Sequence, residues 1–249
     1  MMNISSKEAA ERLIFALDAR TYEEALSWVE LLSGHVGMFK VGKELFTAAG
    51  PGIIHKIKEK SQKIFLDLKF HDIPNTVARA AEAAVALNVD MFNIHASGGS
   101  AMVKEAVEAA SNYADKKGIG RPIVLAVTVL TSLNNDDLRE IGFQKNAGDL
   151  VVHLAGLAKD AGASGVVASP QDISALRKKF GDQFVIVTPG IRTAAEAKKD
   201  DQKRTLCAYD AISAGADYIV VGRPIRMSEN PLETCENIVH EIAEGLAAK

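Results

Sequence analysis

The sequence predicts a single (β/α)8 (TIM) barrel, because eight short apolar runs alternate with amphipathic helical stretches along the whole chain. Its 249 residues, 47% of them hydrophobic, are enough to bury one large core and are typical of one α/β barrel. No Pro/Ser-rich linker, low-complexity tract or charge block divides the chain. We therefore expect one domain over residues 1–249.

The eight strand candidates are near-continuous apolar runs, as expected for parallel strands that are covered on both faces. In chain order they are Leu13–Leu17, Met38–Val41, Ile64–Leu68, Met91–Ile94, Ile123–Val129, Gly165–Ala168, Phe184–Val187 and Tyr218–Val221. The helical stretches between and after them include Tyr22–Leu32, Val77–Asn88, Ala101–Lys117, Asp149–Ala161, Ala208–Ala214 and Pro231–Ala248. A doubly wound open sheet is the structural alternative. It would favour a G-x-G-x-x-G turn after the first strand, where Leu17-Asp18-Ala19-Arg20 stands instead.

Composition narrows the partners and the compartment. The formal net charge is −3 and no run of Lys or Arg is present, which argues against a nucleic-acid or anionic-membrane surface. The stretch from Met1 to Arg12 lacks the apolar core of a signal peptide, and no apolar stretch reaches membrane-spanning length. Cys207 and Cys235 form no C-x-x-C motif, so we expect reduced thiols that serve in packing. These features predict a cytoplasmic protein.

In a barrel of this kind, functional side chains follow the carboxyl ends of the strands. The residues at these positions are Asp18, Lys40, Asp67, Lys69, His95, Thr131, Ser169, Arg192, Gly222 and Arg223. Most of their side chains can ionise or form hydrogen bonds. Acid/base groups thus gather after the early strands and arginines after the late ones.

The segment after the third strand is the most informative. Asp67 and Lys69 are two residues apart on a strand and should project to the same side, with Asp72 just past the strand end and Pro74 at the start of a helix. Ionisable groups packed so closely are costly to bury unless they pair or do chemistry; a solvated turn with a surface ion pair is the alternative. With Lys40 they form an array of alternating ammonium and carboxylate groups. A Mg²⁺ site is a second alternative, which the two lysines disfavour.

The loops after the last two strands suggest anion binding. Thr188-Pro189-Gly190-Ile191-Arg192 follows the seventh strand, and Val221-Gly222-Arg223-Pro224 follows the eighth. In this fold these loops commonly bind phosphate through backbone N–H groups and guanidinium groups, and Gly222 permits close approach of the backbone to a ligand. A turn with a surface cation is the alternative.

Three weaker features accompany these clusters. His71 and His95 belong to no H-x-x-x-H or H-E-x-x-H motif, so we expect them to be structural hydrogen-bonding residues. The pair Gly98-Gly99 precedes a helix and could cradle an anion, although a double glycine alone is weak support for a site.

The run Phe65–Thr76 (FLDLKFHDIPNT) resembles the signature of the bacterial type of the orotidine 5′-phosphate decarboxylase family. Six further segments match that family in order and spacing across nearly the whole chain: Ala16–Asp18, Phe39–Gly42, Ala126–Ser132, Thr188–Arg192, Asp201–Arg204 and Val220–Ile225. In one departure, Thr205-Leu206 follows Arg204 where the family usually carries a Thr-Pro pair.

The resemblance implies a carboxy-lyase that converts orotidine 5′-monophosphate to uridine 5′-monophosphate and CO₂, the last step of de novo UMP synthesis. It also implies a homodimer with shared active sites that needs no metal and no cofactor. Lys69 would donate the proton to C6 of the pyrimidine, Asp67 would face the substrate carboxylate, and Lys40 would belong to the charged array. Asp72 would complete that array in the neighbouring subunit. The implied substrate-binding residues are Asp18, Thr76, Thr131, Arg192, Gln202, Gly222 and Arg223.

Two other functions stay open from the sequence. One is a Mg²⁺-dependent sugar-phosphate lyase or decarboxylase of the same barrel superfamily, which would need an extra acidic ligand after an early strand. Glu44 lies close to Lys40 in the sequence, so this alternative stays open. A non-catalytic nucleotide-binding regulator would have lost a charged residue of the array. All four of those residues are present.

Overall fold

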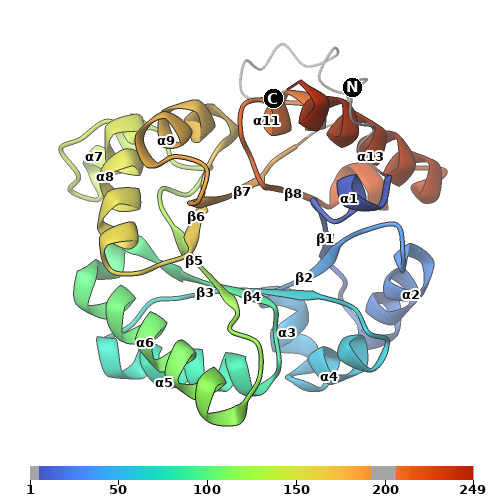
Figure 1. Cartoon of the computed structure of the whole chain (residues 1–249), viewed down its shortest axis with the longest axis horizontal. Helices are drawn as coiled ribbons and strands as arrows, with labels where there is room; N and C mark the ends of the chain where they lie inside the picture. The colour runs from blue at the N-terminus through green and yellow to red at the C-terminus, as the bar shows by residue number, and fades with distance from the viewer. Residues whose placement is uncertain (1–5, 192–205, 249) are drawn as a thin grey trace. The chain divides into compact units, whose positions relative to one another are not determined.

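The computed structural model describes residues 6–191 and 206–248, and its eight parallel strands follow one another in chain order around a closed barrel (Figure 1). The strands are β1 (Leu13–Leu17), β2 (Met38–Gly42), β3 (Ile64–Phe70), β4 (Met91–His95), β5 (Ile123–Val127), β6 (Gly165–Val167), β7 (Val185–Pro189) and β8 (Tyr218–Val221). The predicted fold class is therefore confirmed, and the open doubly wound sheet is excluded.

Helices lie between successive strands along the chain. The α-helices are α1 (Ser6–Ala10), α2 (Tyr22–Leu32), α3 (Lys43–Ala49), α4 (Gly52–Glu59), α5 (Pro74–Ala86), α6 (Gly99–Lys117), α7 (Asn135–Glu140), α8 (Ala147–Asp160), α9 (Ile173–Phe180), α11 (Ala208–Ser213), α12 (Arg223–Arg226) and α13 (Pro231–Ala247). Two 3-10 turns are η1 (Ala96–Gly98) and η2 (Pro170–Asp172). All six predicted helices are present, and α2 has the predicted bounds. Pro74 occupies the first turn of α5, as its fixed φ favours.

β1 and β8 have the predicted bounds, and the other six strands differ from the prediction by one or two residues at one or both ends. β5 stops at Val127 instead of Val129, because its neighbour β6 has only three residues and the last of them, Val167, pairs with Val127. β3 continues to Phe70 instead of ending at Leu68. Apolar pattern alone does not set these ends, since a strand extends only while a partner is available.

The chain divides into two compact units. One is drawn from Met1–Leu68 and Thr188–Lys249, and the other from Lys69–Val187. In the first unit, α13 packs against α11 and α1, which Figure 1 shows next to one another. In the second unit, α5 and α6 pack side by side. The boundaries of the units cut through β3 and β7, so that each unit carries part of those strands.

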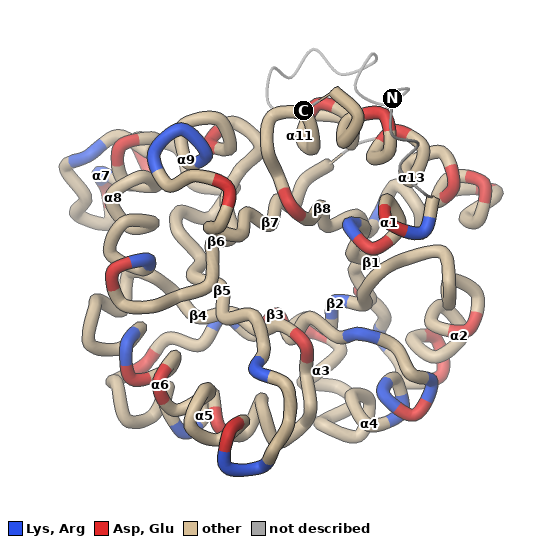
Figure 2. Tube along the Cα trace, viewed as in Figure 1, with Lys and Arg blue, Asp and Glu red and all other residues tan. Residues whose placement is uncertain are grey.

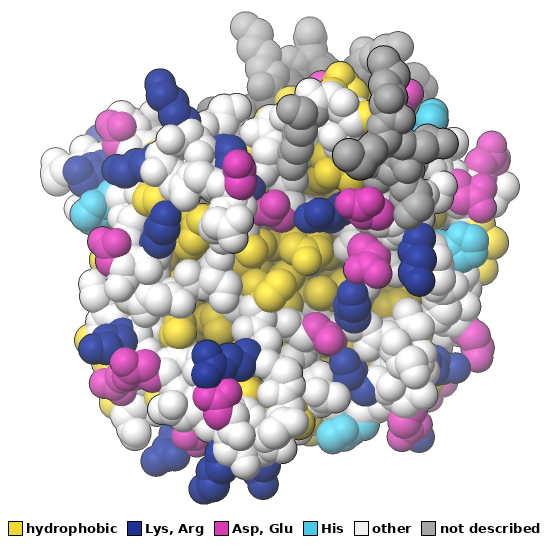
Figure 3. Space-filling model, viewed as in Figure 1, with side chains coloured by type: hydrophobic (Ala, Val, Ile, Leu, Met, Phe, Trp, Pro, Cys, Tyr) yellow, Lys and Arg dark blue, Asp and Glu magenta, His cyan; other side chains and the backbone are white. Residues whose placement is uncertain are grey.

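The strands supply much of the buried apolar surface. All five residues of β1 are buried, and the rings of Phe15 and Phe39 on β1 and β2 meet edge to face at 6.3 Å. Figure 2 shows most of the charged residues on helices and loops, with the strands largely uncharged. On the face in Figure 3, cationic and anionic side chains are interspersed and form no continuous patch of one sign. None of the helices in the described ranges is long and apolar enough to span a membrane.

Gly165, the first residue of β6, has no room for a side chain. A Cβ at this position would lie 2.1 Å from the carbonyl oxygen of Val185 on β7, which is backbone and cannot turn away. We expect Gly165→Ala to lower the free energy of unfolding by about 1–3 kcal/mol, as overpacking does, and the midpoint of thermal unfolding to fall.

The matched control is Gly148→Ala in α8, where the nearest atom to an added Cβ is 3.7 Å away. Because alanine favours helix over glycine, this variant should unfold at the wild-type temperature or higher. Equal melting temperatures for the two variants would contradict the packing described for β6.

Candidate active site

The first unit brings together three charged side chains from three neighbouring strands. The ammonium of Lys40 on β2 lies 3.2 Å from a carboxylate oxygen of Asp67 on β3 and 3.6 Å from one of Asp18, which directly follows β1. The side chains of Lys40 and Asp67 are only 12% exposed, whereas that of Asp18 is 42% exposed. A partly desolvated cation thus separates two carboxylates, and its charge offsets their mutual repulsion. The sequence predicted these residues at strand ends; the structure decides which of them pair.

Two glycines leave room for this cluster. A Cβ at Gly42 would lie 3.1 Å from Nζ of Lys40, and a Cβ at Gly222 would lie 3.3 Å from Oδ2 of Asp18. The turn after β8 therefore passes close to the end of β1. From the sequence, we expected a glycine at position 222 because the backbone there could approach a ligand closely. The structure adds a second reason, which is that the backbone passes close to Asp18.

The turn after β8 is also tied to Asp18 by a residue that the sequence analysis did not select. The guanidinium of Arg226, at the end of α12, donates a hydrogen bond to the backbone carbonyl of Asp18. Arg223, at the start of α12, is exposed. Its guanidinium is therefore accessible at the position where the sequence predicted an anion site.

Part of that predicted anion site lies outside the described residues. Arg192 and Gln202 both fall in 192–205, so the structure says nothing of their placement. Thr188 of β7 is fully buried, and its hydroxyl has no hydrogen-bond partner among the residues that the structure describes.

In the second unit, Lys69 has an unusual backbone conformation. Its φ is 53°, in the left-handed region that side-chain-bearing residues rarely adopt, and its N–H donates to Oδ1 of Asn93 on β4 at 2.8 Å. The expectation that Lys69 follows simple strand alternation assumed an extended backbone, so alternation does not by itself set its direction. Asn93 was also missed. The available signal in the sequence was an amide side chain inside the apolar run of β4. The structure shows that this side chain is fully buried, which is costly unless it is hydrogen-bonded.

Asp72 and Thr76 lie on the surface of the second unit. Asp72 is exposed in the turn between β3 and α5, where its carboxylate accepts a hydrogen bond from the N–H of Ile73 at 2.6 Å. Thr76 is exposed in the first turn of α5. Between them, the apolar side chain of Ile73 is 66% exposed. Both polar residues are therefore accessible from outside this unit.

Thr131 and the two histidines also belong to the second unit. Thr131 is exposed in a turn, four residues beyond the end of β5 rather than two, because β5 ends early. The rings of His71 and His95 lie 5.3 Å apart and form a tilted aromatic pair. Their contact agrees with a structural role for these histidines, through ring packing.

The chemistry of the cluster in the first unit is that of an ion-pair array. The Lys40 ammonium contacts the carboxylate oxygens of both Asp18 and Asp67, which a Mg²⁺ ion would otherwise use as ligands. Glu44, the extra acid of the magnesium alternative, is exposed and lies 4.0 Å from the guanidinium of Arg20. Within the described parts of the chain, no group of three or more His, Cys, Asp or Glu side chains is arranged to hold a metal ion.

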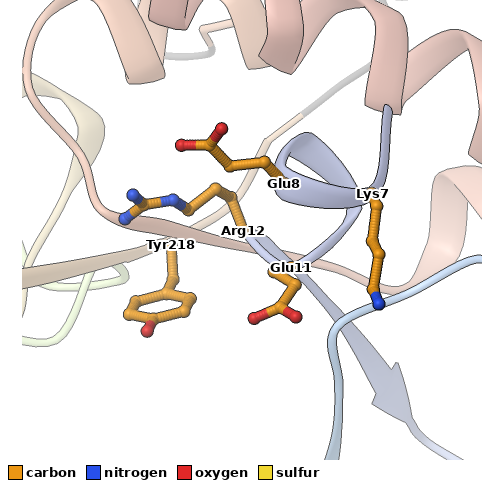
Figure 4. A pocket seen from close by; sticks show the side chains of 5 residues that line it. All are labelled: Lys7, Glu8, Glu11, Arg12 and Tyr218. Carbon is orange, nitrogen blue, oxygen red and sulfur yellow. The ribbon is translucent and has the colours of Figure 1, made fainter. Parts of the chain in front are cut away.

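A cavity of about 380 Å³ lies elsewhere in the first unit, at α1 and the amino ends of β1 and β8 (Figure 4). It is lined by Lys7, Glu8, Glu11, Arg12 and Tyr218. The guanidinium of Arg12 lies over the Tyr218 ring at 5.9 Å, and Glu11 accepts a hydrogen bond from Lys63 at 3.0 Å, which lowers the pKa of that carboxyl. The cavity is at the opposite strand ends from Asp18 and Gly222, so it is separate from the candidate active site.

Cys235 packs in the core as the sequence predicted, whereas Cys207 is only half-buried, at the start of α11. Cys235 on α13 is fully buried, and burial raises the pKa of its thiol to about 12. Burial also raises the pKa of Cys207, whose thiol donates to a carboxylate oxygen of Asp210 at 3.1 Å. Raised pKa values suppress the thiolate form, so neither cysteine is suited to act as a nucleophile.

Comparisons with known proteins agree with the resemblance in the sequence. The model of the family described as orotidine 5′-phosphate decarboxylase / HUMPS matches residues 11–238. The chain is 54% identical to orotidine 5′-phosphate decarboxylase of Syntrophus aciditrophicus over 99% of this chain and 98% of the relative. It is 49% identical to the enzyme of the same name from Geotalea daltonii, over 96% and 98% of the two chains. The crystal structure of orotidine 5′-phosphate decarboxylase from Lactobacillus acidophilus superimposes with a TM-score of 0.82 at 39% identity, covering 92% of this chain and 98% of that one.

One ionisable group beyond β6 has a shifted pKa. Asp172, in the η2 turn, is half-buried, and burial raises the pKa of its carboxyl to about 6. The folded protein therefore holds this proton more tightly than the unfolded chain does. The resulting contribution to stability is complete below about pH 4 and is lost as the pH rises through about 6.

We expect Asp172→Asn to stabilise the protein at pH 7 and to have little effect at pH 4, because the amide never ionises. Thermal unfolding of both proteins across this pH range measures the difference. Asp160→Asn is the matched control for loss of a carboxylate, because the Asp160 side chain is exposed and is not desolvated by burial. A constant difference between Asp172→Asn and wild type at all pH values would contradict the assigned shift.

Proposed function

The chain belongs to the orotidine 5′-phosphate decarboxylase / HUMPS family, and from this premise we propose that the charged residues at its strand ends carry out the decarboxylation of orotidine 5′-monophosphate. The protein is a carboxy-lyase of pyrimidine biosynthesis that forms uridine 5′-monophosphate and CO₂. Near-full-length identity of 54% to a relative of that name is the observation that carries the reaction. The residue roles that follow are our proposal.

Lys69 is the proton donor. Loss of CO₂ from C6 of the pyrimidine leaves a carbanion at that carbon, and no cofactor acts as an electron sink. The ammonium of Lys69 stabilises negative charge as it grows at C6 and then transfers a proton to the carbanion. Enzymes lower barriers by about 8–23 kcal/mol, and a carbanion with so little resonance support needs the upper part of that range.

Asp67 and Lys40 form the electrostatic surroundings of the departing group. Asp67 faces the substrate carboxylate, and the repulsion between the two anions is relieved when neutral CO₂ leaves. Lys40 holds Asp67 in place at 3.2 Å, and its positive charge lies beside the Asp67 carboxylate. The low exposure of both side chains supports these roles, because water screens their charges less.

The remaining predicted residues bind the nucleotide. Asp18 hydrogen-bonds a ribose hydroxyl with the oxygen atoms that Lys40 leaves accessible, and Thr131 contacts the pyrimidine. The phosphate is bound by Gly222, Arg223, Arg192 and Gln202. Phosphate binding takes place far from C6, yet its free energy can orient the substrate at the reacting carbon. The exposed guanidinium of Arg223 beside the Gly222 turn supports this assignment.

The reaction proceeds without a metal or cofactor in this proposal. The support is the position of Lys40 between two carboxylates, where a cation of the protein itself supplies the positive charge. The magnesium-dependent lyase is not supported, since the near-full-length relatives are named orotidine 5′-phosphate decarboxylase.

We further propose a cytoplasmic homodimer in which each chain is one catalytic domain over residues 1–249. The exposed Ile73 between Asp72 and Thr76 supports a contact at this position, because covering its side chain would remove apolar area from water. In this dimer Asp72 completes the charged array of the partner's site, and Thr76 lies at the partner's ribose. Two free cysteines support a reducing compartment.

The reaction is tested by mixing the purified protein with orotidine 5′-monophosphate in excess EDTA and following the absorbance of the pyrimidine. We expect full conversion by the wild type and at least a 10³-fold lower kcat for Lys69→Ala, since the cation and the proton source vanish together, on the order of general acid catalysis.

Lys56→Ala is the control, because Lys56 pairs with Glu59 on the surface of α4. It should leave kcat unchanged. If the wild type fails to convert the nucleotide in EDTA, the cofactor-free reaction is wrong. If Lys69→Ala loses activity only because it no longer folds, seen as a collapse of its thermal midpoint, Lys69 is a structural residue instead.

Sharing of sites is tested by mixing two inactive variants. Lys69→Ala and Asp72→Ala subunits are allowed to exchange. In a mixed dimer, the Asp72→Ala chain keeps its own Lys69 and receives Asp72 from its partner. Half the dimers are mixed and each has one complete site, so roughly a quarter of wild-type activity should return. No recovery, despite exchange confirmed by native mass spectrometry, would show that Asp72 serves its own chain.

A further inference from the structure

The left-handed backbone of Lys69 has no ordinary local cause. Among the described residues, the non-glycine residues with positive φ are Ser61, Lys69 and Asn88. Ser61 and Asn88 follow the C-cap residues of α4 and α5, at the position where a left-handed residue commonly terminates a helix. Lys69 instead lies within β3. A strained conformation at such a position persists only where the surroundings hold it.

Asn93 provides that restraint. It is fully buried on β4 between Phe92 and Ile94, and its Oδ1 accepts the hydrogen bond from the Lys69 N–H at 2.8 Å. A buried carboxamide is costly in an apolar strand unless it is hydrogen-bonded. The amide of Asn93 and the unusual φ of Lys69 therefore account for each other.

Aromatic contacts hold the residues that follow Lys69 against the same strand. The rings of Phe70 and Phe92 lie 6.2 Å apart, and those of His71 and His95 lie 5.3 Å apart. The chain on the carboxyl side of Lys69 is thus packed against both sides of Asn93. Because φ of Lys69 sets where its Cα–Cβ bond points, the contact with Asn93 determines where the flexible lysine side chain starts.

We propose that Asn93 is a positioning residue: its carboxamide holds the Lys69 backbone in the left-handed conformation and thereby places the Lys69 ammonium for proton transfer. This inference rests on the proposed function, in which Lys69 delivers the proton to C6. Asn93 itself touches no reacting atom in this role. Its effect is on the rate of the chemical step. A misplaced proton donor lowers kcat, whereas KM stays close to the wild-type value because the contacts to the phosphate and the ribose are unchanged.

The test compares variants of Asn93 with a matched control. Asn93→Leu removes the acceptor at similar volume, and Asn93→Ala removes it without bulk. Asn93→Asp keeps an oxygen at the same position. Thr128→Val is the control, because Thr128 is also a buried polar side chain of this unit whose hydroxyl bonds to a backbone atom, the carbonyl of Val167 at 3.2 Å.

We expect kcat to fall about 10²-fold in Asn93→Leu and Asn93→Ala, the effect of displacing a catalytic group by about 1 Å, with KM within a few-fold of wild type. The enzyme-catalysed exchange of the C6 hydrogen of uridine 5′-monophosphate in D₂O should fall in parallel, because it uses the same proton transfer. Asn93→Asp should recover at least a tenth of wild-type kcat, and Thr128→Val should keep kcat even if its thermal midpoint drops.

Crystal structures of the variants give a readout that does not depend on the reaction. In Asn93→Leu or Asn93→Ala, φ of Lys69 should change to a negative value. Unchanged φ and kcat would overturn the proposal. The proposal would also be overturned if Asn93→Leu and Asn93→Ala failed to fold while Thr128→Val folded. Asn93 would then have only a structural role. A wild type that is inactive on the nucleotide would refute the proposed function instead, and φ of Lys69 would still decide whether Asn93 holds this backbone.

Discussion

The placement of a single ammonium group between two carboxylates is the constraint on which the first unit depends. Asp18 and Asp67 would repel each other, and the burial of Asp67 would be costly, if Lys40 did not lie within 3.2–3.6 Å of both carboxylates. Parallel pairing makes this possible, because Ala16 of β1 is paired with Lys40 of β2, and Gly42 of β2 with Asp67 of β3. The register of these strands thus brings three charges from separate parts of the sequence into one cluster.

Small residues and one arginine connect this cluster to the turn after β8. Gly222 has no side chain to collide with Asp18, and Arg226 bonds to the carbonyl of the same aspartate. Asp18 therefore contacts both the charged array and the turn that we assign to phosphate. In the proposed function this arrangement joins the two requirements of the reaction, binding energy far from the reacting carbon and a preorganised charge distribution near it.

The second unit solves a different problem, the direction of a long and flexible side chain. A lysine in a regular strand would take its direction from alternation, whereas Lys69 takes it from a left-handed backbone bonded to Asn93. Strain of this kind at a residue with a proposed chemical role agrees with the general observation that such outliers gather at functional sites. The surrounding rings of Phe70, Phe92, His71 and His95 add rigidity to this junction.

The sequence by itself determined the fold class, the order of strands and helices and the strand ends that carry charge, because apolar runs, helix periodicity and Pro74 act over short stretches of chain. It also carried the family, through motifs such as the one around Asp67 and Lys69. Only the tertiary structure decided that β5 ends at Val127, that Lys40 pairs with Asp18 and Asp67, and that Asn93 bonds to Lys69 and Arg226 to Asp18. The physical reason is separation along the chain: Asn93 lies 24 residues from Lys69 and Arg226 lies 208 from Asp18. Contacts over such distances depend on strand register and on the space left by glycines, which no local pattern contains.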